Sequence, residues 1–267
     1  MRLTVLGTGT ARPVPGTPAS GVLVQAGETA VLFDIGSGVA SKLEGVMAAP
    51  KLTGLFAGHY HADHWVDLAP LRYRFPWGER PARPLPVFLP PGAHDKVDQL
   101  ATAIGERPGF FDIAFDITEY ASGQTYQVGA LTVTPHPVGH YIPAWTMDIR
   151  GPAGERLVYG GDMGPSEMVV ELARGADVLI LEATLESALI DDARRGHLAA
   201  EEAIDHARRA GVPQALIVHY PIERREAIAA LCAASGVPIR PAVSGLSIEF
   251  GAGGPAAAVG QETVSTG

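Results

Sequence analysis

Three histidines and an aspartate crowd into six positions, and this cluster constrains the fold of the chain more than any other feature. The segment reads GHYHADH over residues 58–64 and directly follows the apolar run TGLFA. His59, His61 and Asp63 alternate, so in an extended segment their side chains project to one side. The side chain of His64 projects in a different direction and can contact a second position nearby. Imidazole nitrogens combined with a carboxylate oxygen form a ligand set suited to Zn²⁺, with Mn²⁺ and Fe²⁺ as competitors.

The cluster cannot complete two coordination shells alone, so further ligands are expected at the ends of other strands. Asp162 ends the apolar run RLVYGGD and His219 ends QALIVH, just as the cluster itself ends an apolar run. His140 in PVGHYIPAW is the third candidate. Each of the three also has a structural interpretation when taken singly, such as capping a turn. Together they predict a metal site where several strand ends meet at one edge of a sheet.

Strand-like runs and helical patterns alternate along the chain, which is typical of a layered α/β architecture. In the second half this alternation is regular, in the order 156–162 (strand), 166–175 (helix), 177–183 (strand), 199–211 (helix) and 214–219 (strand). No linker divides the chain, so we expect one domain over residues 1–250. The Gly- and Ala-rich stretch 251–267 is expected to be a flexible C-terminal tail.

Composition excludes several classes of protein. With 46% apolar and 18% charged residues, the 267-residue chain is globular and not disordered. Its one cysteine, Cys232, excludes an internal disulfide framework and a thiolate zinc cluster. A net charge of −9 argues against a broad nucleic-acid-binding face. No signal peptide and no apolar run long enough to cross a bilayer is visible, so we expect a cytoplasmic protein with no membrane partner.

The cluster resembles a known signature. His59-Tyr60-His61-Ala62-Asp63-His64 is similar to the HxHxDH motif of the metallo-β-lactamase superfamily, and the later candidates fall in the order that superfamily uses. The opening VLGTGTARPVPGTPASGVLVQAGETAVLFDIGSG resembles the start of its ribonuclease Z-like branch. The segment GHLAAEEAIDHARRAGVPQALIVHYP resembles the end of that branch.

This resemblance implies an αββα sandwich, with two mixed β-sheets packed together and helices outside. It also implies a dinuclear site for two divalent ions, with zinc favoured and manganese or iron as alternatives. The ligands would be His59, His61 and His140 for one ion, Asp63, His64 and His219 for the other, and Asp162 bridging both. A water shared by two such ions becomes hydroxide at neutral pH and attacks the substrate, which suits phosphodiester cleavage.

His197 and Glu182 are the further catalytic candidates, alongside the ligand Asp63. In that branch a histidine at the place of His197 in RRGHLAAEE assists catalysis near the scissile phosphate, and a glutamate in an EAT stretch supports it. His197 is thus expected to be a general acid or a donor to a phosphate oxygen, oriented by Glu182. The alternative is helix N-terminal capping by His197. Asp34 in LFDIGSG resembles an aspartate that buttresses the histidine loop, and Asp67 is expected to be solvated or to support a helix.

The predicted substrate is a small phosphodiester such as a cyclic nucleotide, and a homodimer is expected. No long Gly/Pro-rich arm for transfer RNA is visible between the cluster and His140, and Leu198 and Ala199 replace the usual serine and threonine after His197. A basic strip could dock a phosphate or be ordinary surface charge; it comprises Arg72, Arg74, Arg80 and Arg83. The alternatives are a transfer RNA 3′-processing endoribonuclease, a thioester or lactone hydrolase, and a non-catalytic metal carrier. A true β-lactamase is less favoured.

Overall fold

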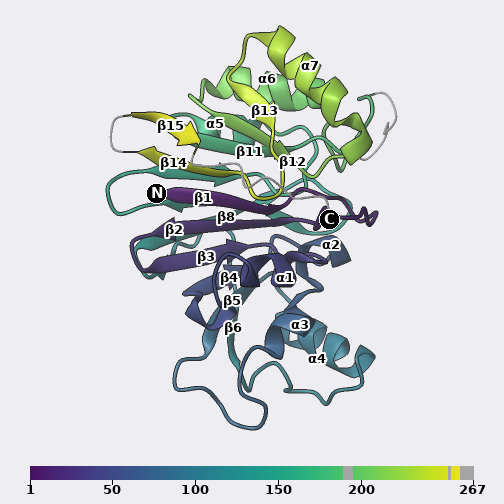
Figure 1. Cartoon of the computed structure of the whole chain (residues 1–267), viewed down its shortest axis with the longest axis vertical. Helices are drawn as coiled ribbons and strands as arrows, with labels where there is room; N and C mark the ends of the chain where they lie inside the picture. Colours follow the sequence, from purple (N-terminus) through teal and green to yellow (C-terminus); the bar gives the residue numbers. More distant parts are fainter. Residues whose placement is uncertain (189–194, 252–253, 259–267) are drawn as a thin grey trace.

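The computed structural model describes residues 1–188, 195–251 and 254–258, which form two mixed β-sheets packed face to face between layers of helices (Figure 1). Three apolar clusters show this layering. One cluster lies between the two sheets. Each of the other two lies between one sheet and the helices that cover it. The expected αββα sandwich is therefore confirmed.

The first sheet changes from antiparallel to parallel pairing along its width. It contains, in spatial order, β15 (Gly254–Ala258), β14 (Ser247–Gly251), β1 (Arg2–Gly7), β2 (Gly21–Ala26), β3 (Thr29–Phe33), β4 (Gly54–Phe56), β5 (Leu85–Leu89) and β6 (Phe115–Glu119). The pairs from β15 to β3 are antiparallel, and those from β3 to β6 are parallel. The inner parallel strands β3, β4 and β5 are mostly apolar on both faces, as burial between helices and the second sheet requires, whereas the edge strand β6 is partly exposed.

The second sheet has the same mixture of pairings. In spatial order it contains β13 (Ile239–Pro241), β12 (Ala215–Val218), β11 (Val178–Glu182), β10 (Arg156–Tyr159), β9 (Ala144–Arg150), β8 (Leu131–Val138) and β7 (Tyr126–Val128). The pairs from β13 to β10 are parallel, and those from β10 to β7 are antiparallel.

Helices cover the outer face of each sheet (Figure 1). The first sheet is covered by α1 (Val39–Glu44), α2 (Ala62–Trp65), α3 (Leu68–Arg72) and α4 (Ala93–Ala103). The second sheet is covered by α5 (Glu167–Ala173), α6 (Ala200–Ala210) and α7 (Arg225–Ser235). Two 3₁₀ turns are also present, η1 (Ala49–Lys51) and η2 (Ile222–Arg224).

The amphipathic pattern over 199–211 predicts α6 correctly. The apolar stripe of the pattern is buried against the second sheet, and its members are Ala200, Ala203, Ile204 and Ala207. The helix ends at Gly211, whose φ of 68° is the left-handed conformation that favours glycine. At the start of the helix, Leu198 and Ala199 are fully buried, which anchors the residue before them, His197.

The carboxyl ends of the parallel strands lie at one edge of the two sheets, where loops carry the predicted site residues. The histidine cluster follows β4 and Asp34 follows β3 in the first sheet. Asp162 follows β10, and His219 follows β12 directly, in the second sheet. Ligand sites of open α/β sheets form at this edge, so the topology alone brings these residues to one place.

Strand β15 lies within the stretch that the sequence predicts to be a tail. It pairs antiparallel with β14, from Ile248 opposite Ala258 to Gly251 opposite Gly254. Residues 252–253 and 259–267 lie outside the described part of the chain, and the predicted domain boundary at residue 250 stays a prediction. No helix among the described residues is long and apolar enough to span a membrane.

The contact of Gly36 with the histidine cluster yields a stability prediction. A Cβ on Gly36 would lie 1.9 Å from the backbone oxygen of Asp63, so Gly36→Ala forces the backbone of the cluster to shift. We expect a loss of about 1–3 kcal/mol in the free energy of unfolding, the range typical of overpacking. Chemical denaturation of the metal-free protein measures it. Gly78→Ala is the matched control, because a Cβ there meets no atom within 4 Å; equal stability of the two variants would contradict the prediction.

Candidate metal centre

The histidine cluster is divided between an extended segment and a short helix. His59 lies in the loop after β4, and His61 is the N-cap of α2 in extended backbone, with ψ of 143°. Asp63 and His64 lie inside α2. The expectation that Asp63 projects with the two histidines of an extended segment is therefore wrong. The helical turn instead directs Asp63 toward a second group of ligands, away from His59 and His61.

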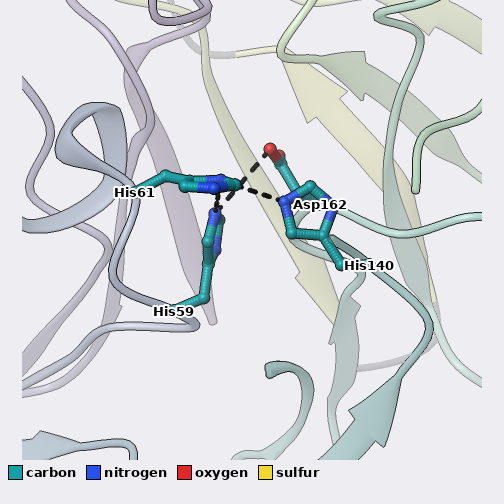
Figure 2. A group of neighbouring side chains, drawn as sticks. All are labelled: His59, His61, His140 and Asp162. Carbon is teal, nitrogen blue, oxygen red and sulfur yellow. Dashed lines mark hydrogen bonds and ion pairs between the residues drawn. The ribbon is translucent and has the colours of Figure 1, made fainter. Parts of the chain in front are cut away.

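The first group of converging side chains joins the extended segment to the second sheet (Figure 2). The Nδ1 atom of His61 lies 3.0 Å from Nε2 of His59 and 3.0 Å from Nε2 of His140. His140 belongs to the loop that follows β8. Asp162 closes this group, with Oδ2 at 3.9 Å from Nε2 of His59. All four residues offer ligand atoms within 4.8 Å of one another.

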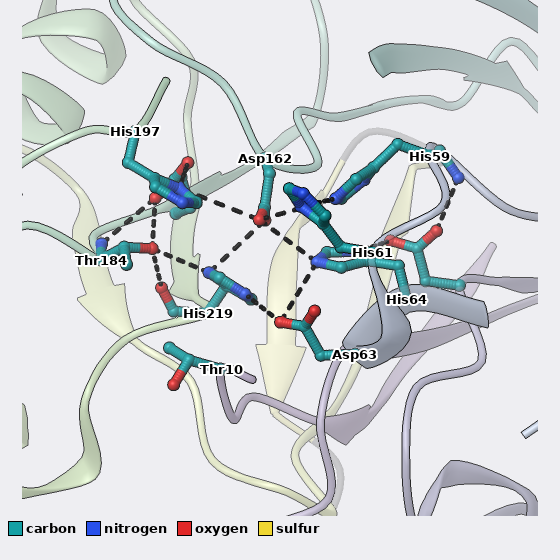
Figure 3. A network of polar contacts seen from close by, with 12 residues as sticks. Thr10, His59, His61, Asp63, His64, Asp162, Thr184, His197 and His219 are labelled. Atoms are coloured by element: carbon teal, nitrogen blue, oxygen red, sulfur yellow. Dashed lines mark hydrogen bonds and ion pairs between the residues drawn. The ribbon is translucent and has the colours of Figure 1, made fainter. Parts of the chain in front are cut away.

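The second group joins α2 to the end of β12 (Figure 3). The Nε2 atom of His219 lies 3.0 Å from Oδ2 of Asp63, and Nε2 of His64 lies 3.8 Å from the same oxygen. Asp63, His64 and His219 thus form a second compact set of ligand atoms.

Asp162 lies between the two groups. Its Oδ2 atom is 3.3 Å from Nε2 of His64 in the second group, and its Oδ1 atom is 3.4 Å from Nδ1 of His219. Gly161 precedes it with φ of 63°, a left-handed turn that aims Asp162 back toward the strand ends. One carboxylate therefore faces both groups, which is the position that a bridging ligand requires.

The chemistry of these atoms fits divalent cations. Tetrahedral bonds of about 2.0–2.1 Å place neighbouring ligand atoms about 3.3 Å apart, close to the separations of 3.0–3.9 Å found here. Within the described part of the chain, Nε2 of His64 and Oδ1 of Asp162 are buried and make no hydrogen bond. Unpaired buried polar atoms are costly, and a cation between them removes that cost. The seven predicted ligands therefore meet as a two-ion site requires, and their ligand role stays a prediction.

The neutral state of two imidazoles favours cation binding at the first group. Burial lowers the pKa of His59 well below its usual 6.5, and the adjacent His64 lowers it further. Burial also lowers the pKa of His140 to about 4. Both rings are thus neutral at pH 7 and offer a lone pair. For His64 burial opposes the charge, but Asp162 and Asp34 outweigh it and raise the pKa well above 6.5. A cation at the second group must therefore displace a proton.

Asp34 orients His64 and supports the histidine cluster. Its Oδ1 atom accepts a hydrogen bond of 2.7 Å from the backbone N–H of Gly58, so the predicted buttress is confirmed. Its Oδ2 atom lies 2.7 Å from Nδ1 of His64, which fixes Nε2 of that ring toward the site. Tyr159 donates a third bond of 2.7 Å to Oδ2. Sequence reasoning missed Tyr159, because nothing in its strand marks a partner in the other sheet.

Thr184 is a second residue that sequence reasoning missed. Its Oγ1 atom lies 2.8 Å from Nδ1 of His219 and donates a hydrogen bond of 2.5 Å to Oε2 of Glu182. Its one hydroxyl proton goes to the carboxylate, so Oγ1 accepts from the N–H of His219 and leaves Nε2 free for a cation. His140 is held similarly, with Nδ1 at 2.6 Å from the backbone oxygen of Gly196. The only sequence signal for Thr184 is its place two residues after Glu182.

His197 and Glu182 are hydrogen-bonded, as the sequence predicts. Nδ1 of His197 lies 2.7 Å from Oε1 of Glu182, which is fully buried. The same oxygen accepts a hydrogen bond of 2.9 Å from the backbone N–H of Met163. Burial lowers the pKa of His197, but the bond to Glu182 outweighs burial and raises that pKa above 6.5. His197 is also 3.8 Å from Oδ2 of Asp162 and packs beside Tyr141. It therefore lies at the edge of the candidate metal centre.

The four arginines of the basic strip do not form a common surface. Arg72 is buried and donates to the backbone oxygens of Phe110 and Pro76, a structural role that the sequence did not indicate. Arg74 pairs with Glu44, and Arg80 pairs with Asp116. These three side chains are therefore unavailable as a joint phosphate site. Asp67 accepts a hydrogen bond from the N–H of Ala40 in α1, so it supports a helix as expected, although it is buried and not solvated.

Known proteins resemble this chain over most of its length. The family model described as "Beta-lactamase superfamily domain" matches residues 29–220. An uncharacterized protein of Mycobacterium leprae is 34% identical over 94% of this chain and 89% of its own length. A protein named ribonuclease Z from Mycobacterium bovis is 28% identical over 82% of this chain and 86% of its own length. The structure of the metallo-β-lactamase fold protein YhfI from Bacillus subtilis gives a TM-score of 0.80 at 26% identity, covering 92% of this chain and 98% of that one.

The hydroxyl of Thr184 can be tested without changing a ligand. Thr184→Val removes the acceptor of His219 and the donor to Glu182 while it keeps the volume of the side chain. We expect about 10- to 100-fold weaker metal binding, the usual effect of losing an orienting bond. Competition with a chromophoric chelator measures the affinity of each variant. Thr184→Ser keeps the hydroxyl and should retain wild-type affinity; weakening in both variants alike would rule out the hydrogen bond as the cause.

Proposed function

Because the chain belongs to the metallo-β-lactamase superfamily, in its ribonuclease Z-like branch, we propose that its candidate metal centre hydrolyses small phosphodiesters such as cyclic nucleotides. The coarser assignment follows from the family: the chain is a metal-dependent hydrolase. The reaction, the substrate class and the roles of single residues are the parts that we propose.

The proposed first ion is held by His59, His61 and His140, and the proposed second ion by Asp63, His64 and His219, with Asp162 between them. Zn²⁺ is the cation that we propose, because neutral imidazoles with few carboxylates in near-tetrahedral separations suit it best. Two such cations lower the pKa of water and stabilise negative charge on phosphoryl oxygens. The protein contributes the orientation of the ligands, through Asp34, Thr184 and the backbone oxygen of Gly196.

His197 is proposed as the acid that protonates the leaving group. Its Nδ1–H is bonded to Glu182, so Nε2 is the nitrogen that can carry a proton to the substrate. Hydrolysis of an alkyl phosphodiester releases an alkoxide, which needs a proton as the phosphorus–oxygen bond breaks. That proton moves from Nε2 of His197 to the leaving oxygen, and Glu182 stabilises the charged ring before the transfer. The bond to Glu182 raises the pKa of His197 and so favours the charged ring.

The observation that carries the proposal is this His197–Glu182 pair, 3.8 Å from Asp162 and outside the predicted ligand set. Asp162, His197 and His219 also offer ligand atoms within 4.8 Å of one another, and we propose the acid role because His197 stands outside the seven residues of the predicted ligand set. Three features support a small substrate. The net charge is −9, three of the four strip arginines are occupied, and Leu198 and Ala199 are buried after His197. Transfer RNA 3′ processing is the second candidate, because the ribonuclease Z of M. bovis is similar to this chain.

A substrate panel tests the proposed reaction. Protein loaded with Zn²⁺ or Mn²⁺ is assayed on bis(p-nitrophenyl) phosphate, cyclic nucleotides, precursor transfer RNA and an acyl thioester, with metal content measured in parallel. We expect about two metal equivalents per chain, turnover of the phosphodiesters, and loss of turnover after chelation. Cleavage of precursor transfer RNA alone would select the second candidate. Cleavage of the thioester alone would overturn phosphodiester hydrolysis, and no hydrolysis by fully loaded protein would favour a carrier.

The loss of rate on removal of the proposed acid should depend on the leaving group of the ester. His197→Ala should lower kcat on an alkyl phosphodiester by about 10²- to 10⁴-fold, and less on a p-nitrophenyl ester, whose leaving group needs no proton. In the wild type, kcat on the alkyl ester should fall as pH rises through the raised pKa of His197, because the ring then loses its proton. That alkaline decline should be absent in His197→Ala.

Two further variants make the test of His197 specific. Glu182→Gln should also reduce kcat more on the alkyl ester than on the p-nitrophenyl ester, while the protein retains its metals. His94→Ala removes an exposed histidine on α4 and should behave as the wild type on every ester. Equal losses of His197→Ala on alkyl and p-nitrophenyl esters would exclude the acid role.

A further inference from the structure

A cavity of about 620 Å³ lies beside the candidate metal centre, between the loop at residues 10–19 and helix α1. The loop forms one wall, and residues within and on either side of α1 form the other, with part of α2. Asp63 lines the same cavity, so the cavity is continuous with the second group of ligands. We call it the loop pocket. Its other lining residues take no part in the reaction described above.

The lining of the loop pocket combines apolar surface with a few polar groups. The apolar part includes Pro13, Val14 and Pro18, and the polar part consists mainly of hydroxyl groups and one ammonium group. The polar side chains are Thr10, Thr17, Ser37, Ser41 and Lys42. Pockets of about 300–1,000 Å³ with such linings bind organic molecules of moderate size. Apart from the predicted ligand Asp63, no carboxylate among the described residues lines the pocket, so Lys42 makes it suited to an anion.

Lys42 is the residue that indicates the charge of the occupant. Within the described residues its side chain makes no ion pair and no hydrogen bond, although the chain carries an excess of acidic groups. Nearby cations are paired, since Arg74 bonds Glu44 and Arg12 bonds Glu223. Lys42 is half-buried on α1, one helical turn beyond Gly38, which also lines the pocket. An unpaired ammonium at this position can bind a phosphate or carboxylate of a ligand.

The loop pocket and His197 lie on different sides of the ligands. Figure 3 shows Thr10 beside Asp63 and His219, with His197 on the other side of the His219 ring. A phosphodiester has two ester arms, one that leaves and one that stays on phosphorus. If the leaving oxygen faces His197, the retained arm must point elsewhere, and the loop pocket is a cavity that adjoins Asp63.

We propose that the loop pocket binds the retained arm of the substrate, and that Lys42 binds a second anionic group on that arm. This inference rests on the proposed function. It narrows the small phosphodiesters to acyclic ones in which an organic group of roughly nucleoside size carries a further phosphate or carboxylate, a class that no longer includes simple cyclic nucleotides.

Three p-nitrophenyl phosphodiesters with different retained arms test the inference. The arms are methyl, thymidine, and thymidine bearing a 3′-phosphate. For the wild type we expect KM to fall about ten-fold when the 3′-phosphate is added, the effect of one charge-assisted hydrogen bond. Lys42→Ala should remove this advantage, whereas Lys42→Arg should keep it. Lys51→Ala removes the same charge from the exposed turn before β4 and should leave the advantage unchanged. Full advantage in Lys42→Ala would overturn the role of Lys42.

A second variant fills the loop pocket. Ser41 is exposed on α1, so Ser41→Trp occupies the cavity without burying a new side chain in the core. We expect kcat/KM for the thymidine ester to fall at least about ten-fold relative to the methyl ester, with metal content and circular dichroism unchanged. An unchanged ratio would overturn the pocket as the site of the retained arm.

Binding measurements separate this inference from the proposed function. If the metal-loaded wild type hydrolyses none of the esters, the proposed function fails. The pocket is then judged by calorimetry with thymidine 3′,5′-bisphosphate. Binding that weakens about ten-fold in Lys42→Ala, but not in Lys51→Ala, supports the pocket without catalysis. Equal binding by both variants, or none by the wild type, overturns it.

Discussion

The buried carboxylate of Asp34 is the contact on which the architecture of the site depends. Asp34 follows β3 of the first sheet. It accepts hydrogen bonds from the N–H of Gly58, just after β4, and from the hydroxyl of Tyr159 on β10 of the second sheet. The same oxygen that binds Tyr159 also holds His64 at 2.7 Å. One side chain therefore joins the packing of the two sheets to the direction of a predicted ligand. Relative movement of the sheets would rotate the His64 ring and change the space between the ligand groups.

Glu182 has the corresponding position in the second sheet. It ends β11 and binds His197 through Oε1, and through Oε2 it binds Thr184, which in turn holds His219. A predicted ligand and the proposed acid thus share one buried carboxylate. Their tautomers are coupled, because each ring places its Nδ1–H on this network and leaves Nε2 toward the site. The network depends on the strand order β10-β11-β12, because these neighbouring strands place the residues at their carboxyl ends side by side.

Local pattern predicted much of this molecule, and contacts between distant strands account for what it missed. The spacing of His59, His61 and His64 and the strand ends at Asp162 and His219 identified side chains that converge in space. The pattern could not show that α2 begins at Ala62, because four residues carry too little periodicity to mark a helix. Tyr159 and Thr184 escaped notice because their partners lie on other strands. Arg72 was expected either to help dock a phosphate or to be ordinary surface charge, yet it is buried and donates hydrogen bonds to the backbone oxygens of Phe110 and Pro76.

The left-handed backbone of two site residues links folding to metal occupancy. Among the described residues, only Asp34 and His219 adopt positive φ without being glycine, at 60° and 46°. Each such conformation costs roughly 1–2 kcal/mol for an L-residue. Both occur at the residue directly after a strand, whose side chain must face the candidate metal centre. Hydrogen bonds offset part of that cost at both residues, at Asp34 with Gly58 and Tyr159 and at His219 with Thr184. The ring of His219 also faces Asp63 and Asp162, so a cation held by those carboxylates would stabilise it further. The metal-free protein should thus unfold locally more easily than the metal-bound protein. An organism short of the cation would then accumulate chains that proteases degrade more readily.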